Sequence, residues 1–197
     1  MMQRLRLLLG TLLLFFFTAC GTDTPYQVDP NRGFDLWEYM TSIRNYTVEY
    51  AIYENGQQVN YYNETHKLFG NSYERRSASG KTTVFLNGGD MFMKEEILDS
   101  VTGTTSIQGT DISRYVGIGD RNIFRSQNLQ MCTVERFFSD YTNKGIRFYN
   151  VLMIACTTRS GIQQEFYYAF NEGIVTLYQN DRGFIKEFIK VKEEPIF

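Results

Sequence analysis

The segment YTVEYAIYENGQQVNYY, residues 46–62, decides the fold class of this chain. In its first half, apolar or aromatic side chains alternate with other side chains at Tyr46, Val48, Tyr50 and Ile52. Because successive side chains of a strand point to opposite faces, this alternation predicts a half-buried β-strand. Asn55-Gly56 follows, and this dipeptide between two such runs is typical of a hairpin with a two-residue turn.

The turn at Asn55-Gly56 also predicts which residues of the two strands face each other. The expected opposite pairs are Tyr53 with Gln58, Ile52 with Val59, and Tyr50 with Tyr61. This register gathers apolar and aromatic side chains on one face of the hairpin, as a sheet with one buried face requires.

Strand-like runs separated by turn residues continue along most of the chain. We expect strands at 71–77, 82–86, 91–97, 129–138, 146–158, 163–170, 174–179 and 184–191. Regularly spaced short strands are typical of antiparallel proteins, and the 16 Phe and 14 Tyr residues favour pleated surfaces. The prediction is a mainly β fold: a single antiparallel meander sheet, strongly curved or a half-barrel, with one short N-terminal helix.

Two segments depart from this pattern. Residues 34–40, FDLWEYM, predict the short helix, with Asp35 as its cap and Glu38 completing a capping box. Trp37, the single tryptophan, is expected to fill the core. Residues 99–122 are rich in Gly, Thr, Ser and Asp and predict a long irregular loop with one short element over 112–118. Loops of that length inside a compact domain are usually functional.

The N-terminus predicts where the protein works. Arg4 and Arg6 precede an apolar run over residues 7–17, and small residues lead to Cys20. This order is typical of a secretory signal, and the run is too short to span a membrane as a helix. An ordinary secretory signal, in which Cys20 has no special role, is one interpretation of this segment.

The motif Phe17-Thr18-Ala19-Cys20 resembles the lipobox of bacterial lipoproteins. That resemblance implies that Cys20 receives a diacylglyceryl group, that the signal is cut before Cys20, and that the new amino terminus is acylated. It places the protein on the periplasmic side of a bacterial envelope. Gly21 after the lipidated cysteine favours the outer membrane over the inner membrane.

These features divide the chain into a signal peptide at 1–19, a lipidated flexible tether at 20–33 and a single antiparallel β domain at 34–197. Removal of the signal takes away two of the 20 basic residues and none of the 22 acidic ones, so the mature chain carries a formal charge of −4. An acidic balance without a basic stripe argues against nucleic acid as a partner.

The two remaining cysteines, Cys132 and Cys156, are expected to form a disulfide, because an even pair in an exported protein usually does. A three-residue turn at 143–145 pairs Thr142 with Ile146. The same register places Cys132 directly opposite Cys156, near enough for a bridge.

The residue types offer little for catalysis. His66 is the only histidine, which excludes HExxH and multi-histidine metal sites, and we expect it to be a solvated side chain near a strand end. There is no GxSxG motif and no P-loop. Glu95 and Glu96 adjoin on a predicted strand, so they point to opposite faces and cannot act as one acid/base pair. We therefore expect no catalytic residues, no metal site, no cofactor and no enzymatic activity.

The order of a short helix and then strands in FDLWEYMTSIRNY, TVEYAIY and NSYERRSASGKTTVFLNGGDMFM resembles the periplasmic lipoprotein carriers and their outer-membrane receptors over residues 34–97. That resemblance implies a half-barrel sheet wrapped around helices that encloses an apolar pocket. Lipocalin-like barrels are a second candidate.

Two functions remain open. The first is a binding module for a lipid or another small envelope ligand, in which the concave sheet and residues 99–122 form an apolar site. The second is a structural or assembly lipoprotein that docks onto an envelope protein. A cavity of at least ~300 Å³ favours the first function, and an exposed aromatic patch over a filled core favours the second. The sequence does not single out ligand-binding residues.

Overall fold

The computed structural model describes residues 28–196. The predicted signal, Cys20 and the tether up to residue 27 lie outside the described residues. The last part of the predicted tether contacts the domain, because Val28 packs against the core and a short 3-10 helix follows it.

The described chain consists almost entirely of strands. Its elements are η1 (Pro30–Arg32), β1 (Phe34–Asp35), α2 (Leu36–Met40), β2 (Tyr46–Glu54), β3 (Gln57–Phe69), β4 (Ser72–Ser77), β5 (Gly80–Asn87), β6 (Asp90–Leu98), β7 (Thr105–Ser113), β8 (Tyr115–Val116), β9 (Phe124–Arg125), β10 (Leu129–Asn143), β11 (Ile146–Thr158), β12 (Gln163–Ala169), β13 (Gly173–Asp181) and β14 (Phe184–Pro195). Within residues 28–196, no helix is long and apolar enough to cross a membrane.

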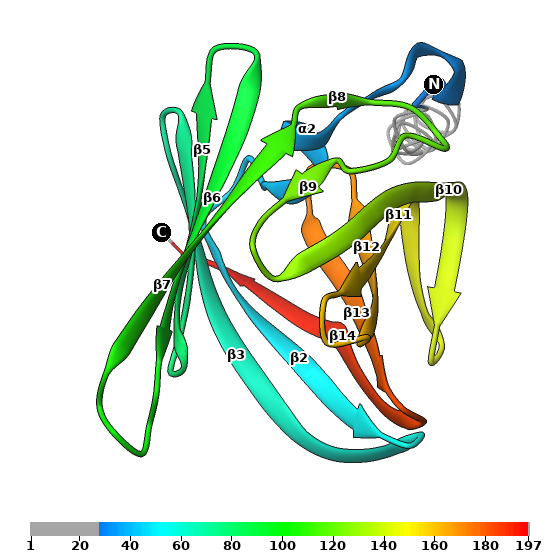
Figure 1. Ribbon diagram of the computed structural model, residues 1–197. Coiled ribbons are helices and arrows are strands. Elements are labelled where there is room, and N and C mark those ends of the chain that lie inside the picture. Colours follow the sequence, from blue (N-terminus) through cyan, green and yellow to red (C-terminus); the bar gives the residue numbers. More distant parts are fainter. Residues whose placement is uncertain (1–27, 197) are drawn as a thin grey trace, which may run out of the picture.

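Twelve strands form one antiparallel sheet that is strongly curved and nearly closed into a barrel (Figure 1). Strands β2 to β7 and strands β10 to β14 are two meanders, and pairing of β14 with β2 joins them. The sheet's two edge strands are β9 and β10, and the segment just before β9 meets β10 through a bridge between Arg121 and Thr133. The predicted fold is therefore confirmed: mainly β, one curved antiparallel sheet and one short helix near the N-terminus.

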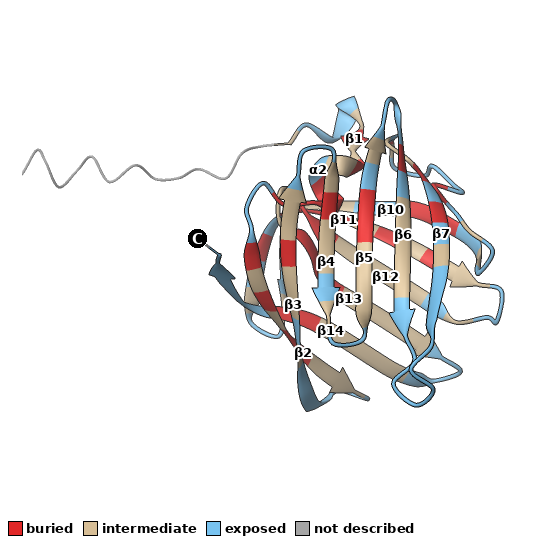
Figure 2. Ribbon diagram, turned by 90° about the vertical axis from the view of Figure 1, so that its left-hand side faces the viewer, coloured by how far each residue is buried: buried red, intermediate tan, exposed pale blue. Residues whose placement is uncertain are grey.

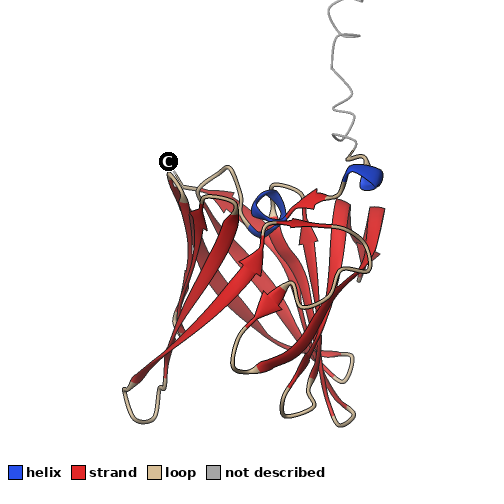
Figure 3. Ribbon diagram, turned by 45° about the horizontal axis from the view of Figure 1, so that its top comes forward, coloured by secondary structure: helices blue, strands red, loops and turns tan. Residues whose placement is uncertain are grey.

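The helix α2 lies at one end of this barrel together with the small β1–β8 ribbon (Figure 3). Asp35 caps the helix as predicted, since its carboxylate accepts a 3.0 Å hydrogen bond from the backbone N–H of Trp37. The same carboxylate binds Arg114 with two nitrogens, which ties the helix to the chain before β8. The carboxylate of Glu38 makes no hydrogen bond in the described chain, so the capping box is not completed. Trp37 does not fill the core as expected: it is partly buried and packs against the core from its margin.

The prediction of a long irregular loop at 99–122 is wrong. Residues Thr105–Ser113 form strand β7, which pairs with β6 over nine positions, and β8 follows directly. Polar β7 residues such as Gln108 and Thr110 face the barrel interior, so this strand does not show the apolar alternation that marks a buried face.

The predicted register of the first hairpin is wrong by one residue over most of its length. Tyr53 pairs with Gln58 as expected, but a bulge follows, so Ile52 faces Asn60 and Tyr50 faces Tyr62. The Asn60 side chain accepts a 2.8 Å hydrogen bond from the backbone N–H of Tyr61 at this irregularity. A bulge adds one residue to one strand, and neither the turn nor the alternation reveals it.

The buried side chains form two clusters. The larger cluster fills the barrel near α2, where the buried positions of β4 and β5 also lie (Figure 2). The smaller one lies beneath the β10–β11 hairpin, where Tyr141 stacks on Tyr167 with ring centroids 4.7 Å apart. At the tip of this hairpin, Asn143 donates a 2.6 Å hydrogen bond to Glu187 of β14. The hairpin thus folds back over the outside of the sheet, and the barrel interior beyond the α2 end is free for a cavity.

Candidate binding cavity

The barrel interior contains a cavity of about 550 Å³. Side chains from both meanders line it, and Ser79 and Asn128, which are exposed, lie at its margin. Ser79 follows β4, and Asn128 accepts a backbone hydrogen bond from Arg159 in the β11–β12 turn. These turns lie at the end of the barrel opposite α2, so the buried cluster near α2 closes the cavity at one end and the cavity opens at the other.

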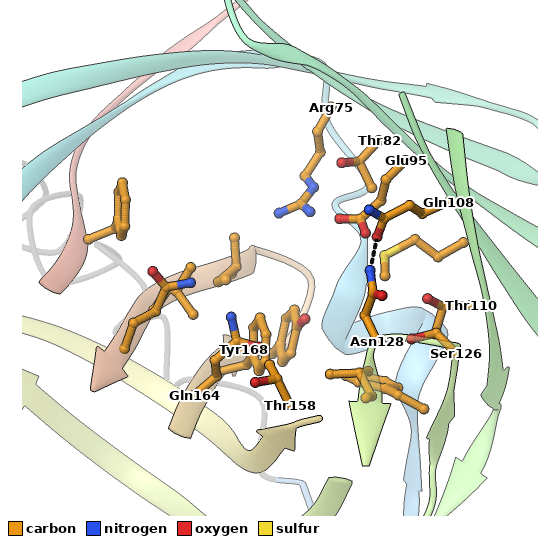
Figure 4. A pocket seen from close by; sticks show the side chains of 18 of the residues that line it. Arg75, Thr82, Glu95, Gln108, Thr110, Ser126, Asn128, Thr158, Gln164 and Tyr168 are labelled. Atoms are coloured by element: carbon orange, nitrogen blue, oxygen red, sulfur yellow. Dashed lines mark hydrogen bonds between the residues drawn. The ribbon is translucent and has the colours of Figure 1, made fainter. Parts of the chain in front are cut away.

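The two walls of the cavity differ in character. The β9–β14 wall is mostly apolar and includes Leu129, Phe166, Leu177 and Phe188. The β4–β7 wall carries a polar group made of Arg75, Thr82, Glu95 and Gln108 (Figure 4). An apolar wall that faces a few fixed polar groups is the usual composition of a small-molecule site.

The polar group follows the sheet register. Arg75 pairs with Thr82, Thr82 pairs with Glu95, and Glu95 pairs with Gln108, so the four residues form one cross-strand row on the inner face. We call these four residues the polar row. Because adjacent strands lie about 4.8 Å apart, the backbones of Arg75 and Glu95 are about 10 Å from each other. Gln108 is held by a 2.7 Å hydrogen bond from Asn128.

Arg75 reaches into the cavity from one wall and Tyr168 from the opposite wall (Figure 4). Neither side chain makes a hydrogen bond or an ion pair within residues 28–196. Burial works against the charge of Arg75, but Glu64, together with smaller contributions from the tyrosines around it, outweighs burial and keeps the pKa of Arg75 above its ordinary value. Burial raises the pKa of Tyr168 to about 12, although the charge of Arg75 opposes the rise. Arg75 is therefore a cation with free donors, and Tyr168 keeps its proton.

A polar network lies beside Arg75, and two of its members, Tyr62 and Glu64, also line the cavity. The imidazole of His66 contacts Glu64 through Nε2 at 2.9 Å and Tyr73 through Nδ1 at 2.6 Å, and Tyr62 donates to the other oxygen of Glu64 at 3.1 Å. Burial lowers the pKa of His66, although Glu64 opposes this shift. The ring is therefore neutral, with the proton on Nε2, because the carboxylate can only accept. Nδ1 then accepts from the hydroxyl of Tyr73.

Glu64 is a carboxylate in this network. Burial would raise its pKa, but the charge of Arg75 and the hydrogen bonds from His66 and Tyr62 outweigh burial and hold the pKa below the usual value. The expectation that His66 is solvated is wrong, since its side chain is 0% exposed. The next strand covers it, because Arg75 pairs with His66 and Tyr73 lies two positions before Arg75 on the same face.

Glu95 and Glu96 lie on opposite faces, as predicted. Glu95 lines the cavity, and Glu96 forms ion pairs with Lys81 and Lys94 outside. His66 and Tyr73 are fully buried and do not line the cavity, so they offer no base to a bound molecule. In the described part of the chain, no group of three His, Cys, Asp or Glu residues is placed to hold a metal ion.

The predicted disulfide is present: Cys132 and Cys156 are bonded, with Cα atoms 4.1 Å apart, and both are buried in the larger cluster. Cys20, the predicted lipidation site, lies outside the described residues. Sequence reasoning did not single out Arg75 or Glu95 as site residues. The available signal was alternation along the strand: Arg75 lies two positions after Tyr73 and Glu95 two positions after Met93, so each shares the inward face of that residue.

No protein-family model matches this sequence, and no curated protein matches it either.

Proposed function

We propose that this protein is a non-enzymatic binding module that holds a lipid or another small amphiphilic molecule in the barrel. We further propose that it is a lipoprotein of the bacterial envelope, anchored through Cys20, with the outer membrane favoured. The observation that carries the binding function is the 550 Å³ cavity with one apolar wall and one polar wall. Its volume lies within the ~300–1,000 Å³ range of small-molecule sites.

Native mass spectrometry of the protein, extracted in a mild detergent from its own membranes, tests this function. We expect a bound small molecule that survives gentle desolvation. Replacement of Thr110, which faces the cavity, by Trp should fill the space and abolish that adduct. The matched control is Ile107→Trp on the same strand, because the Ile107 side chain is 64% exposed on the outer face. An adduct that persists in Thr110→Trp would contradict binding in the cavity.

Docking onto an envelope protein is the second candidate, and one surface feature favours it. Phe69, Phe85 and Phe92 are between 38% and 57% exposed on the outer face of β3, β5 and β6. Phe85 and Phe92 are direct cross-strand partners, and Ser72 of β4 pairs with both Phe69 and Phe85. A reproducible protein partner that is lost in Phe92→Ser, with no small-molecule adduct in any preparation, would reverse the order of the two functions.

A further inference from the structure

The polar row contains two opposite charges that the protein itself leaves unpaired. Arg75 and Glu95 both line the cavity, and neither side chain forms a hydrogen bond or ion pair with any residue in the range 28–196. The hydroxyl of Thr82, the residue between them in the register, makes no hydrogen bond in this range either. A molecule that fills the cavity displaces solvent from both charges, so it must offer a partner to each or leave a costly desolvated ion.

The charges around the cavity argue against a simple anion as the ligand. Glu64 already offsets the charge of Arg75 electrostatically, although both Glu64 oxygens are occupied by His66 and Tyr62. Glu95 then adds a negative charge that no cation among the described residues balances, because Lys81 and Lys94 pair with Glu96 on the outer face. An anionic ligand would bring a further negative charge into an interior that is already acidic.

A simple cation also leaves the site incomplete. It would satisfy Glu95, but the guanidinium of Arg75 would lose its solvent without gaining an acceptor. Five N–H donors on a rigid fork suit a carboxylate or a phosphate, and the hydroxyl of Tyr168 on the facing wall can donate to the same group.

We propose that the ligand is a zwitterionic amphiphile, whose anionic group binds Arg75 and Tyr168 and whose ammonium group binds Glu95. Its hydrocarbon part lies against the apolar wall that includes Phe166, Leu177 and Phe188. The anionic group is a phosphate or a carboxylate, and the cationic group is a primary ammonium, as in an ethanolamine phospholipid or an amino-acid lipid. This inference rests on the proposed binding function and names its substrate class.

The test is a competition between head groups on one hydrocarbon chain length. Lysophosphatidylethanolamine and N-acyl ornithine are the two zwitterions, lysophosphatidylglycerol is the anion, and a fatty amine is the cation. Each is titrated into the full-length mature protein in detergent, and occupancy is read by native mass spectrometry. We expect at least one zwitterion to bind roughly tenfold more tightly than the anion and the cation. A tenfold difference in affinity corresponds to the contribution of about one charge-assisted hydrogen bond. The zwitterion that binds identifies phosphate or carboxylate as the anionic group.

Two substitutions separate the roles of the charges. Glu95→Gln should remove the preference for the zwitterion over the anion, whereas Arg75→Gln should weaken binding of both by roughly tenfold. The matched controls are the sequence neighbours on the outer face, Glu96→Gln and Arg76→Gln, which should change neither value. If Arg75→Gln does not fold, Arg75→Lys keeps the charge and should keep the order of head groups.

The outcomes test the zwitterion inference separately from the proposed binding function. If all four probes bind equally, or if the anion binds best, and Thr110→Trp blocks them, the cavity is a binding site and the zwitterion inference is wrong. If no probe binds, or if the cation binds best, the zwitterion inference is wrong, and the adduct from the protein's own membranes decides the binding function separately.

Discussion

Cys132 and Cys156 lie directly opposite each other on β10 and β11, with a disulfide between them and Cα atoms 4.1 Å apart. The predicted three-residue turn is wrong, because Asn143 pairs with Ile146 around a two-residue turn. An irregularity between Val134 and Arg136 then shifts the register back by one. The two differences cancel, so the cysteines meet as the sequence predicted. Since β10 is an edge strand of the sheet, the bridge fastens that edge to its neighbour.

Loss of this bridge should destabilise the protein considerably. The cysteines are 24 positions apart, and a closed loop of that length stabilises a fold by about 3.5 kcal/mol in the chain-entropy model. We expect the double variant Cys132→Ala/Cys156→Ala to lose roughly that much free energy of unfolding, measured by urea denaturation. Intact mass after unfolding and alkylation, with and without reductant, checks the bridge in the wild type. Two alkylated thiols without reductant would contradict it.

The stability of the protein should fall as the pH drops below about 6.5. The pKa of His66 is lowered by burial in the folded state, so the unfolded chain binds a proton at a pH where the folded chain does not. The stabilisation is complete above the unfolded pKa and is lost as the pH falls, by at most about 1.4 kcal/mol per pH unit. Urea denaturation between pH 7.5 and pH 5.5, on protein without a histidine tag, measures this slope.

His66→Gln is the matching variant, because His66 is the only histidine in the chain. It should cost roughly 1–3 kcal/mol at pH 7.5 through the lost hydrogen bonds, and it should remove the slope. A slope that persists in this variant would show that another group causes it.

Gly80 at the start of β5 should not tolerate a side chain. Its φ is +150°, and a Cβ atom there would lie 2.1 Å from the backbone oxygen of Glu96. We expect Gly80→Ala to cost roughly 2–4 kcal/mol, since both the backbone angle and the cross-strand contact oppose it. The control is Gly89→Ala, where nothing lies within 4 Å, and it should change stability by less than about 0.5 kcal/mol. Equal urea midpoints for the two variants would refute the steric argument.

Cys20 should control the membrane association of the protein. Several acyl chains anchor a protein stably where a single chain does not, so the wild type should sediment with membranes and enter the detergent phase. Cys20→Ser should leave an unprocessed precursor or release the protein. Mass spectrometry of the N-terminal peptide identifies the acyl groups. An unmodified amino terminus on soluble wild-type protein would contradict the lipoprotein assignment.

Turn chemistry explains why most of the fold could be predicted. Asn55 and Lys144 both adopt positive φ with a glycine next in sequence, and such pairs mark strand ends reliably. Bulges have no comparable signature, and one of them shifted the first hairpin by a residue. Strand β7 was missed because its inward side chains include Gln108 and Thr110, which face a cavity instead of a packed core.

The candidate site could not be predicted for a related reason. Alternation separates the two faces of a strand, but it does not tell whether the inward face is packed or lines a cavity. Arg75 and Glu95 alternate with their neighbours as surface residues do, and only the register of β4, β5 and β6 brings them to one cavity wall. Burial of His66 depends on Tyr73 of the paired strand β4, and the sequence does not reveal that pairing.

The α2 end of the barrel is also where the proposed membrane tether joins the domain. Val28 packs at this end, since it borders the same surface hollow as Phe137, and Phe137 stacks on Phe34 of β1. With Cys20 lipidated as proposed, eight residue steps separate the acyl chains from Val28, a reach of at most roughly 30 Å. The tether then joins the barrel at its closed end, and the mouth beside Ser79 and Asn128 lies at the other end. If the tether is held short, a ligand reaches the mouth from the aqueous space and not from the bilayer around the anchor.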